Sequence, residues 1–151
     1  MTRLRTPSQT VGPFYSLGLC RSPQTEVIPN GSVQLVGQVL DGAGEPVPDA
    51  VVELWQPGEG GTRWGRCGTD TEGRFRFVTE LPVDGYADVL VFARGLLKHL
   101  VTRCYFEQVD DPVLATLDAA DRETLLARPD GDSLHFDIRL QGDRQTVFFA
   151  V

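Results

Sequence analysis

Histidine, tyrosine and cysteine are scarce in this sequence, which limits the chemistry that the chain can perform by itself. Among 151 residues there are two histidines, three tyrosines and three cysteines. The cysteines, Cys20, Cys67 and Cys104, are odd in number and widely spaced, and none belongs to a CxxC pair. This pattern predicts reduced thiols and a cytoplasmic setting, and it argues against a disulfide framework or a thiolate metal site.

The sequence also has fewer basic than acidic residues and no long apolar run. The formal net charge of −7 argues against nucleic-acid binding, because contact with phosphates needs clustered lysine and arginine. No apolar stretch is long enough to span a bilayer. Arg3 and Arg5 are not followed by the apolar run of a signal peptide, so we expect none. These absences leave an ordinary soluble protein as the expected class.

From Val33 onward, short apolar segments alternate with turn signals. This pattern predicts an all-β domain, a β-sandwich of short and mostly antiparallel strands, over residues 33–151. Residues 1–32 show little periodicity and are predicted to form an extended N-terminal arm. The expected strands cover residues 33–39, 51–55, 74–78, 88–92, 99–106, 134–140 and 147–151, with a glycine-rich loop at 57–68.

A single short helix is expected over residues 119–127. Asp118 suits its N-cap, and Asp121 would lie in its first turn, where a negative charge is favourable. In the strand over 74–78, Arg74 and Arg76 alternate with two phenylalanines and are expected to form one solvated strand face.

Four segments carry a resemblance to a known family. TPSQTVGPFY (6–15), GQVLDGAGEPVPDAVVELWQ (37–56), VFARGLLKHLVTRCY (91–105) and FDIRLQGDRQTVFF (136–149) cover about half of the chain. The first, third and fourth segments resemble the alpha subunits of the intradiol dioxygenases that cleave protocatechuate, and the second resembles the core of the wider intradiol dioxygenase family. Residues 57–90 correspond poorly. The resemblance implies a β-sandwich, in agreement with the strand pattern.

The resemblance also implies that this chain binds no iron. Catalytic members of the family hold Fe³⁺ with two tyrosines and an His-x-His pair, but these histidine positions fall here on Tyr86 and Asp88. Residues 57–85 contain no tyrosine. His99 and His135 are isolated, which is typical of structural histidines. We therefore expect no catalytic residue in this chain and Fe³⁺ held by a partner beta subunit.

By resemblance, the alpha and beta chains share an active site at their interface, where O₂ cleaves protocatechuate to 3-carboxy-cis,cis-muconate. The alpha contribution falls on five substrate-binding residues: Thr10, Gly12, Pro13, Phe14 and Arg94. Glycine allows a backbone to approach a flat ligand, and proline fixes the turn. The guanidinium of Arg94 matches a carboxylate with two donors, which suits the group that distinguishes protocatechuate from catechol.

Other interpretations remain open from the sequence. The arm over 6–15 could pack on a neighbouring sheet without touching a ligand, and Arg94 could pair with an acidic residue in a strand-end turn. The chain could be a stand-alone dioxygenase with iron bound by Tyr86, Asp88, Tyr105 and a histidine. It could also be a non-catalytic β-sandwich binding module.

Overall fold

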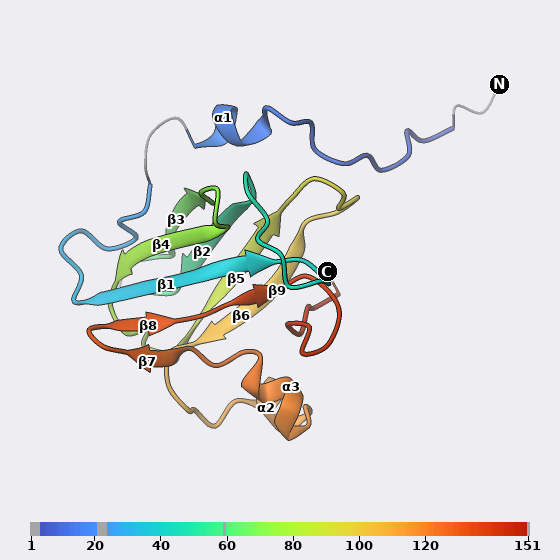
Figure 1. The fold of residues 1–151 in the computed structure, drawn as a ribbon. Helices are drawn as coiled ribbons and strands as arrows, with labels where there is room; N and C mark the ends of the chain where they lie inside the picture. Colours follow the sequence, from blue (N-terminus) through green and yellow to red (C-terminus); the bar gives the residue numbers. More distant parts are fainter. Residues whose placement is uncertain (1–3, 21–23, 59, 151) are drawn as a thin grey trace.

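The computed structural model describes residues 4–20, 24–58 and 60–150, which form two β-sheets packed face to face (Figure 1). The five-stranded sheet has the order β4-β1-β8-β7 with β9 beside β1. Its strands are β1 (Val33–Leu40), β4 (Arg74–Thr79), β7 (Arg128–Asp130), β8 (Ser133–His135) and β9 (Ile138–Arg139). The four-stranded sheet has the order β3-β2-β5-β6, with β2 (Val51–Gln56), β3 (Arg63–Gly68), β5 (Tyr86–Phe92) and β6 (Leu100–Tyr105).

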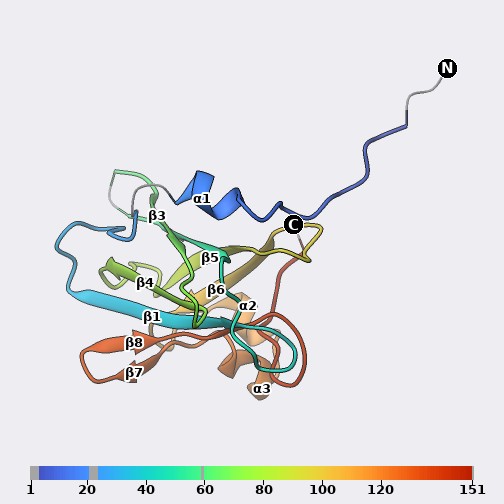
Figure 2. The same cartoon turned by 45° about the horizontal axis from the view of Figure 1, so that its top comes forward.

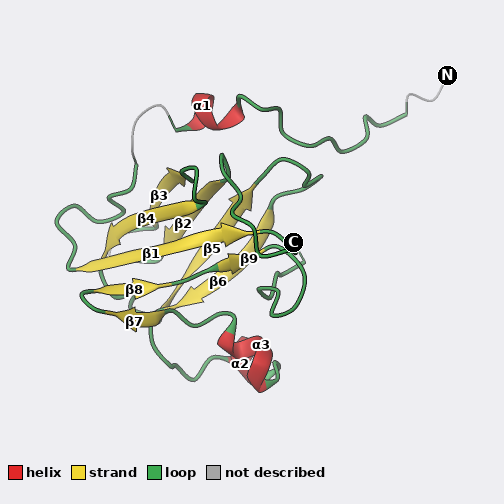
Figure 3. Ribbon diagram, viewed as in Figure 1, coloured by secondary structure: helices red, strands yellow, loops and turns green. Residues whose placement is uncertain are grey.

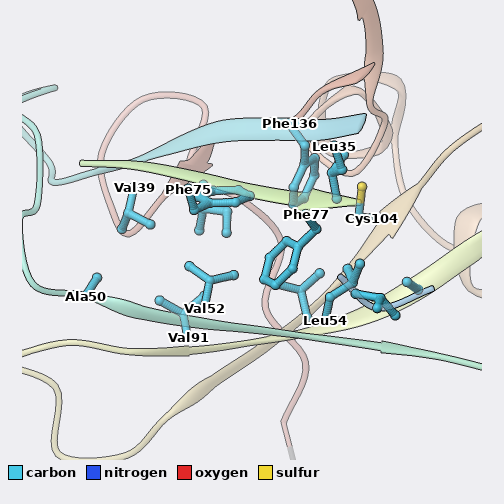
Figure 4. Packing of buried hydrophobic residues seen from close by; sticks show 14 of the residues in the cluster. Leu35, Val39, Ala50, Val52, Leu54, Phe75, Phe77, Val91, Cys104 and Phe136 are labelled. Carbon is cyan, nitrogen blue, oxygen red and sulfur yellow. The ribbon is translucent and has the colours of Figure 1, made fainter. Parts of the chain in front are cut away.

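Alternating apolar residues explain why these segments become strands that share one core. In β4, Phe75 and Phe77 are buried while Arg74 and Arg76 are exposed. The side chains of the two sheets meet in one cluster that includes Leu35, Val39, Val52, Leu54, Phe75, Phe77, Val91, Cys104 and Phe136 (Figure 4). Most strand pairs are antiparallel, and β1 pairs in parallel with β8 and β9. The predicted all-β sandwich is confirmed.

The prediction of a single helix was wrong, because the described residues include three short helices (Figure 3). They are α1 (Tyr15–Leu19), α2 (Pro112–Ala115) and α3 (Ala119–Glu123). Asp111 caps α2 by accepting from the N–H of Val113 at 2.6 Å, and proline follows at the first helical position.

The helix predicted over 119–127 begins at the expected cap but ends early. The Asp118 carboxylate accepts from the N–H of Asp121 at 2.9 Å. Beyond α3, Leu125 is fully buried, and its carbonyl accepts from the N–H of Tyr105 at 2.8 Å. This pairing draws the chain into β7, so tertiary contacts override the helical pattern.

Several strand predictions also need correction. The segment predicted as a loop over 57–68 contains β3, which pairs with β2 from Val51 to Gln56. The strand predicted over 134–140 is divided into β8 and β9, and the carboxylate of Asp137 between them accepts from the N–H of Gln38 at 3.0 Å. The residues from 147 to 150 form no strand, although the N–H of Phe149 donates to the carbonyl of Val101 at 2.8 Å. Position 151 lies outside the described residues.

The arm is not uniformly extended, since its described part contains α1. Figure 2 shows this arm crossing one end of the sandwich and continuing away from it.

The three cysteines are free thiols, and burial raises the pKa of Cys104 well above its ordinary value. Within the described ranges, no helix combines the length and the apolar character needed to cross a membrane.

Candidate functional site

Arg94 lies just beyond the end of β5, in a turn that holds its guanidinium near the surface. Ala93 before it is buried, and Gly95 after it has φ of 90°, a left-handed conformation that favours glycine. Nε of Arg94 lies 3.3 Å from Oδ1 of Asp49, and Nη2 lies 2.9 Å from Oδ2. The arginine side chain stays 53% exposed. The pair is a two-point contact that orients the guanidinium without covering it.

The N-terminal arm is attached to this same turn. The N–H of Gly95 donates to the hydroxyl of Thr10 at 2.8 Å. The hydroxyl of Tyr15 lies 2.8 Å from the carbonyl oxygen of Asp49 and 2.7 Å from that of Phe92, so one proton is shared between two acceptors. Thr10 and Tyr15 therefore fix the arm beside Arg94.

The protonation state of Tyr15 suits this attachment. Burial raises the pKa of its phenol to about 12, and the neighbouring carboxylate of Asp49 adds to the rise. The phenol therefore stays protonated, and able to donate, well above neutral pH. At the far end of α1, Nη1 of Arg66 donates to the carbonyl of Leu19 at 3.3 Å, which fixes the arm at a third point.

Gly12, Pro13 and Phe14 lie between these attachment points and are exposed. The N–H of Tyr15 donates to the carbonyl of Gly12 at 3.3 Å, which closes a turn, and Phe14 keeps 75% of its side chain exposed. Helix α1 buries none of its residues, and Leu17 is 67% exposed. An arm that is fixed in place and turns apolar groups outward has the character of an interaction surface.

The five predicted site residues thus occupy one end of the sandwich. Thr10 is hydrogen-bonded to the turn that holds Arg94. Gly12, Pro13 and Phe14 lie farther along the same arm and form no hydrogen bond or ion pair with the guanidinium. Sequence reasoning missed Asp49. An acidic residue after the Pro48 turn is too common a feature to identify the partner of Arg94, which lies 45 positions away in the sequence.

A second arginine occupies the outer face of the four-stranded sheet. Asp88 of β5 lies opposite Arg103 of β6, and the Nε–Oδ1 distance is 3.2 Å. Nη1 of Arg103 lies 3.3 Å from Oδ2 of Asp111 and 3.5 Å from the hydroxyl of Tyr105. Its guanidinium carbon is 4.1 Å from the centre of the Tyr86 ring. The groups weighed above as atypical iron ligands therefore surround an arginine cation.

The electrostatics of this cluster favour the charged arginine. Burial alone would lower the pKa of Arg103, but the bond to Tyr105 and the nearby Tyr86 and Asp88 raise it overall. Burial raises the pKa of Tyr105, partly opposed by the arginine. A hollow of about 590 Å³ opens beside the cluster. It is lined by Trp55, Pro57, Thr62, Asp88, Leu90, Val101, Arg103, Val113 and Phe149.

Neither histidine joins this cluster. His99 packs against the ring of Phe92 with centroids 5.4 Å apart, and His135 lies on the other sheet, 2.8 Å from Asp137. Across residues 4–20, 24–58 and 60–150, no three His, Cys, Asp or Glu side chains form a group that could hold a metal ion. With a guanidinium among Asp88, Asp111 and Tyr105, the residues present do not fit a ferric ion.

Comparison with known proteins identifies close relatives, although no protein-family model matches the chain. The protocatechuate 3,4-dioxygenase alpha chain of Burkholderia cepacia is 37% identical, with an alignment that covers all of both chains. The alpha chain of Pseudomonas putida is 31% identical over 95% of each chain. The beta chain of Burkholderia cepacia is 28% identical over 73% of this chain and 64% of its own length.

Solved structures with the same fold include intradiol dioxygenases. The dioxygenase domain of a carbohydrate-binding fusion protein from Streptomyces sp. SirexAA-E has a TM-score of 0.59 at 24% identity, covering 80% of this chain and 88% of that one. Hydroxyquinol 1,2-dioxygenase from Pseudomonas putida DLL-E4 has a TM-score of 0.58 at 19% identity, covering 92% of this chain and 63% of that one. At these identities the likeness concerns the fold alone.

Proposed function

This chain belongs to the family of protocatechuate 3,4-dioxygenase alpha chains, subunits of intradiol ring-cleaving enzymes, and we propose that it lines a substrate pocket completed by a beta subunit. In this proposal the assembled enzyme cleaves protocatechuate with O₂ to 3-carboxy-cis,cis-muconate. Fe³⁺ held by the beta subunit would activate the substrate toward dioxygen. This chain would bind and orient the substrate. The relatives favour this subunit role over a stand-alone enzyme or a binding module.

The half-exposed guanidinium of Arg94 is the observation that carries the proposal. Asp49 occupies Nε and one N–H of Nη2, which leaves the Nη1 edge without an acceptor among the described residues. A guanidinium offers five N–H donors in a fixed plane, so the free edge is available to a substrate carboxylate while the paired edge keeps its orientation. Such charge-assisted bonds are about twice as strong as neutral ones.

The arm would form the second wall of the pocket. Thr10 holds the arm to the Arg94 turn, and the backbone at Gly12 and Pro13 has room for a flat ring to approach, since an added side-chain carbon at Gly12 would meet nothing within 4 Å. Phe14 would add an apolar edge. In the isolated chain these groups face solvent, so the pocket becomes a water-excluding site only when a partner covers the arm.

Reconstitution with a beta subunit tests the proposal. The chain alone, the beta subunit alone and the co-expressed pair are compared by oxygen uptake with protocatechuate, by iron analysis and by size-exclusion chromatography. We expect a complex that contains both chains, with full turnover only in the pair. Full turnover by the beta subunit alone would refute the shared pocket. Stoichiometric iron in the isolated chain with the absorption of a tyrosinate complex would instead favour a stand-alone enzyme.

A further inference from the structure

The outer face of the five-stranded sheet carries a row of basic side chains. Strand register places Arg76 of β4 and His135 of β8 on either side of Val36, and Arg128 of β7 opposite His135. Residues directly opposite one another in neighbouring strands point to the same face. The row therefore places three basic side chains side by side on a chain whose net charge is −7.

Strand β9 and the loop after it add two arginines, Arg139 at the end of the strand and Arg144 in the loop. Arg139 and Thr146 hold the loop closed, since the N–H of Arg139 donates to the Thr146 hydroxyl and the N–H of Thr146 donates to the Arg139 carbonyl, both at 3.0 Å. Arg144 lies between them with φ of 59° and an exposed side chain. Thr146 itself is only 1% exposed. The loop is thus anchored by a buried residue.

These elements enclose a pocket of about 180 Å³. The polar residues that line it are Glu123, Thr124, Arg128, His135, Asp137, Arg139, Arg144 and Thr146. A volume below the usual range for drug-sized ligands limits the occupant to a small molecule. The three guanidinium groups of the walls are donors for an oxyanion. Nε2 of His135 is already paired with Asp137, and the Thr124 hydroxyl donates to the carbonyl of Asp121 at 2.7 Å.

The acidic residues that line the pocket do not balance the positive charges of its arginines. Asp137 is engaged by His135 at 2.8 Å and by the N–H of Gln38 at 3.0 Å. Glu123 lies 3.7 Å from Arg128, and both side chains are about 70% exposed, so this pair is weak. In the part of the chain that the structure describes, no ion pair involves Arg139 or Arg144. Three arginines therefore face two acidic groups, one of them already engaged.

We propose that this pocket binds a small multivalent oxyanion, a di- or tricarboxylate or a phosphate. A ligand with two or more negative groups can bridge Arg128 on the sheet and Arg144 on the loop. No single carboxylate of the described residues pairs with both arginines. Binding would hold the loop after β9 against α3. The site lies on the opposite sheet from the proposed substrate pocket and does not depend on it.

Calorimetric titration of the full chain with citrate and with inorganic phosphate, at constant ionic strength, tests the proposal. We expect saturable binding of at least one anion, and the tighter of the two identifies the ligand as a carboxylate or a phosphate. Arg144→Gln should weaken binding by about tenfold, the equivalent of one lost charge-assisted bond. The double variant Arg128→Gln, Arg144→Gln should weaken it further. Absence of saturable binding of both anions would overturn the proposal.

A matched control separates a built site from general charge attraction. Arg63→Gln removes the same charge from an exposed side chain of β3, on the other sheet, and should change the affinity less than twofold. An equal loss in Arg63→Gln and Arg144→Gln would refute the pocket. Because Arg144 is exposed, its variant should keep the thermal unfolding midpoint of the parent chain, and Arg144→Lys should recover part of the affinity.

Discussion

Arg94 lies in the turn after β5 and Arg103 in the neighbouring strand β6, and their surroundings differ. Arg103 is 23% exposed and contacts two carboxylates, one hydroxyl and an aromatic ring. Arg94 is 53% exposed and contacts one carboxylate on one edge. The number of acceptors already engaged distinguishes a cation that holds the protein together from one that is available to a ligand.

The Arg103 cluster also shows how the outer face of β5 is balanced by a cation of the protein. Asp88 and Tyr86, on the outer face of β5, contact Arg103. Arg103 places a positive charge beside the Asp88 carboxylate and over the ring of Tyr86. The proposed pocket function depends on the other end of β5, at Arg94.

Replacing Arg103 should have the largest effect on stability. Arg103→Ala leaves Asp111, whose side chain is 13% exposed, without its cation, and it removes the contact over the Tyr86 ring. We expect a loss of about 2–3 kcal/mol in the free energy of unfolding, reduced from the value for a fully buried pair because Asp88 is half exposed. Urea unfolding measures this value.

Arg94→Ala is the matched variant for this comparison, since it removes an exposed pair. It should cost less than about 1 kcal/mol of stability. Equal losses in the two variants would contradict the different roles assigned to the two arginines.

Tyr15→Phe should have a smaller effect, confined to the arm. It removes the hydrogen bonds to Asp49 and Phe92 at a cost of about 1 kcal/mol. Faster hydrogen exchange in α1, with unchanged exchange in the β-sheets, would show that the arm has been released. Unchanged exchange throughout α1 would mean that the phenol does not hold the arm.

The same residue predicts a dependence on alkaline pH. The pKa of Tyr15 is about 12 in the folded chain and near 10 in the unfolded one, so the unfolded state loses its proton first as the pH rises. The stability from this phenol is complete below pH 10 and is lost between about pH 10 and 12. In an ultraviolet titration of phenolate, the difference between parent and Tyr15→Phe should show one tyrosine ionising near pH 12.

The fold was largely predictable because its main strands alternate cleanly. In β1 and β4 the core-facing apolar side chains recur every second residue, whereas β5 was recognised as a nearly continuous apolar run. Strand β3 escaped prediction because Gly65 and Gly68 interrupt its pattern, and its pairing with β2 decides its conformation. Asp111 and Pro112 form a cap signal that could have predicted α2, whereas α1 has only five residues and buries none of them, so no burial pattern marks it.

The candidate site was less predictable, because its geometry depends on residues far apart in the sequence. Resemblance pointed to Thr10 and Arg94, and the structure joins them through Gly95, 85 positions from Thr10. Neither the Asp49 partner nor the Arg103 cluster follows from local patterns. Both depend on the register of paired strands and on turns that only the folded chain brings together.

The central claim is that Arg94 recognises the substrate carboxylate in the assembled enzyme. The most direct measurement compares KM for protocatechuate with KM for catechol, which lacks that carboxylate, in complexes that carry either the parent chain or Arg94→Ala. We predict that KM for protocatechuate rises about 10-fold to 100-fold while KM for catechol stays unchanged. Equal KM values for protocatechuate in both complexes, or an equal rise for both substrates, would contradict the account.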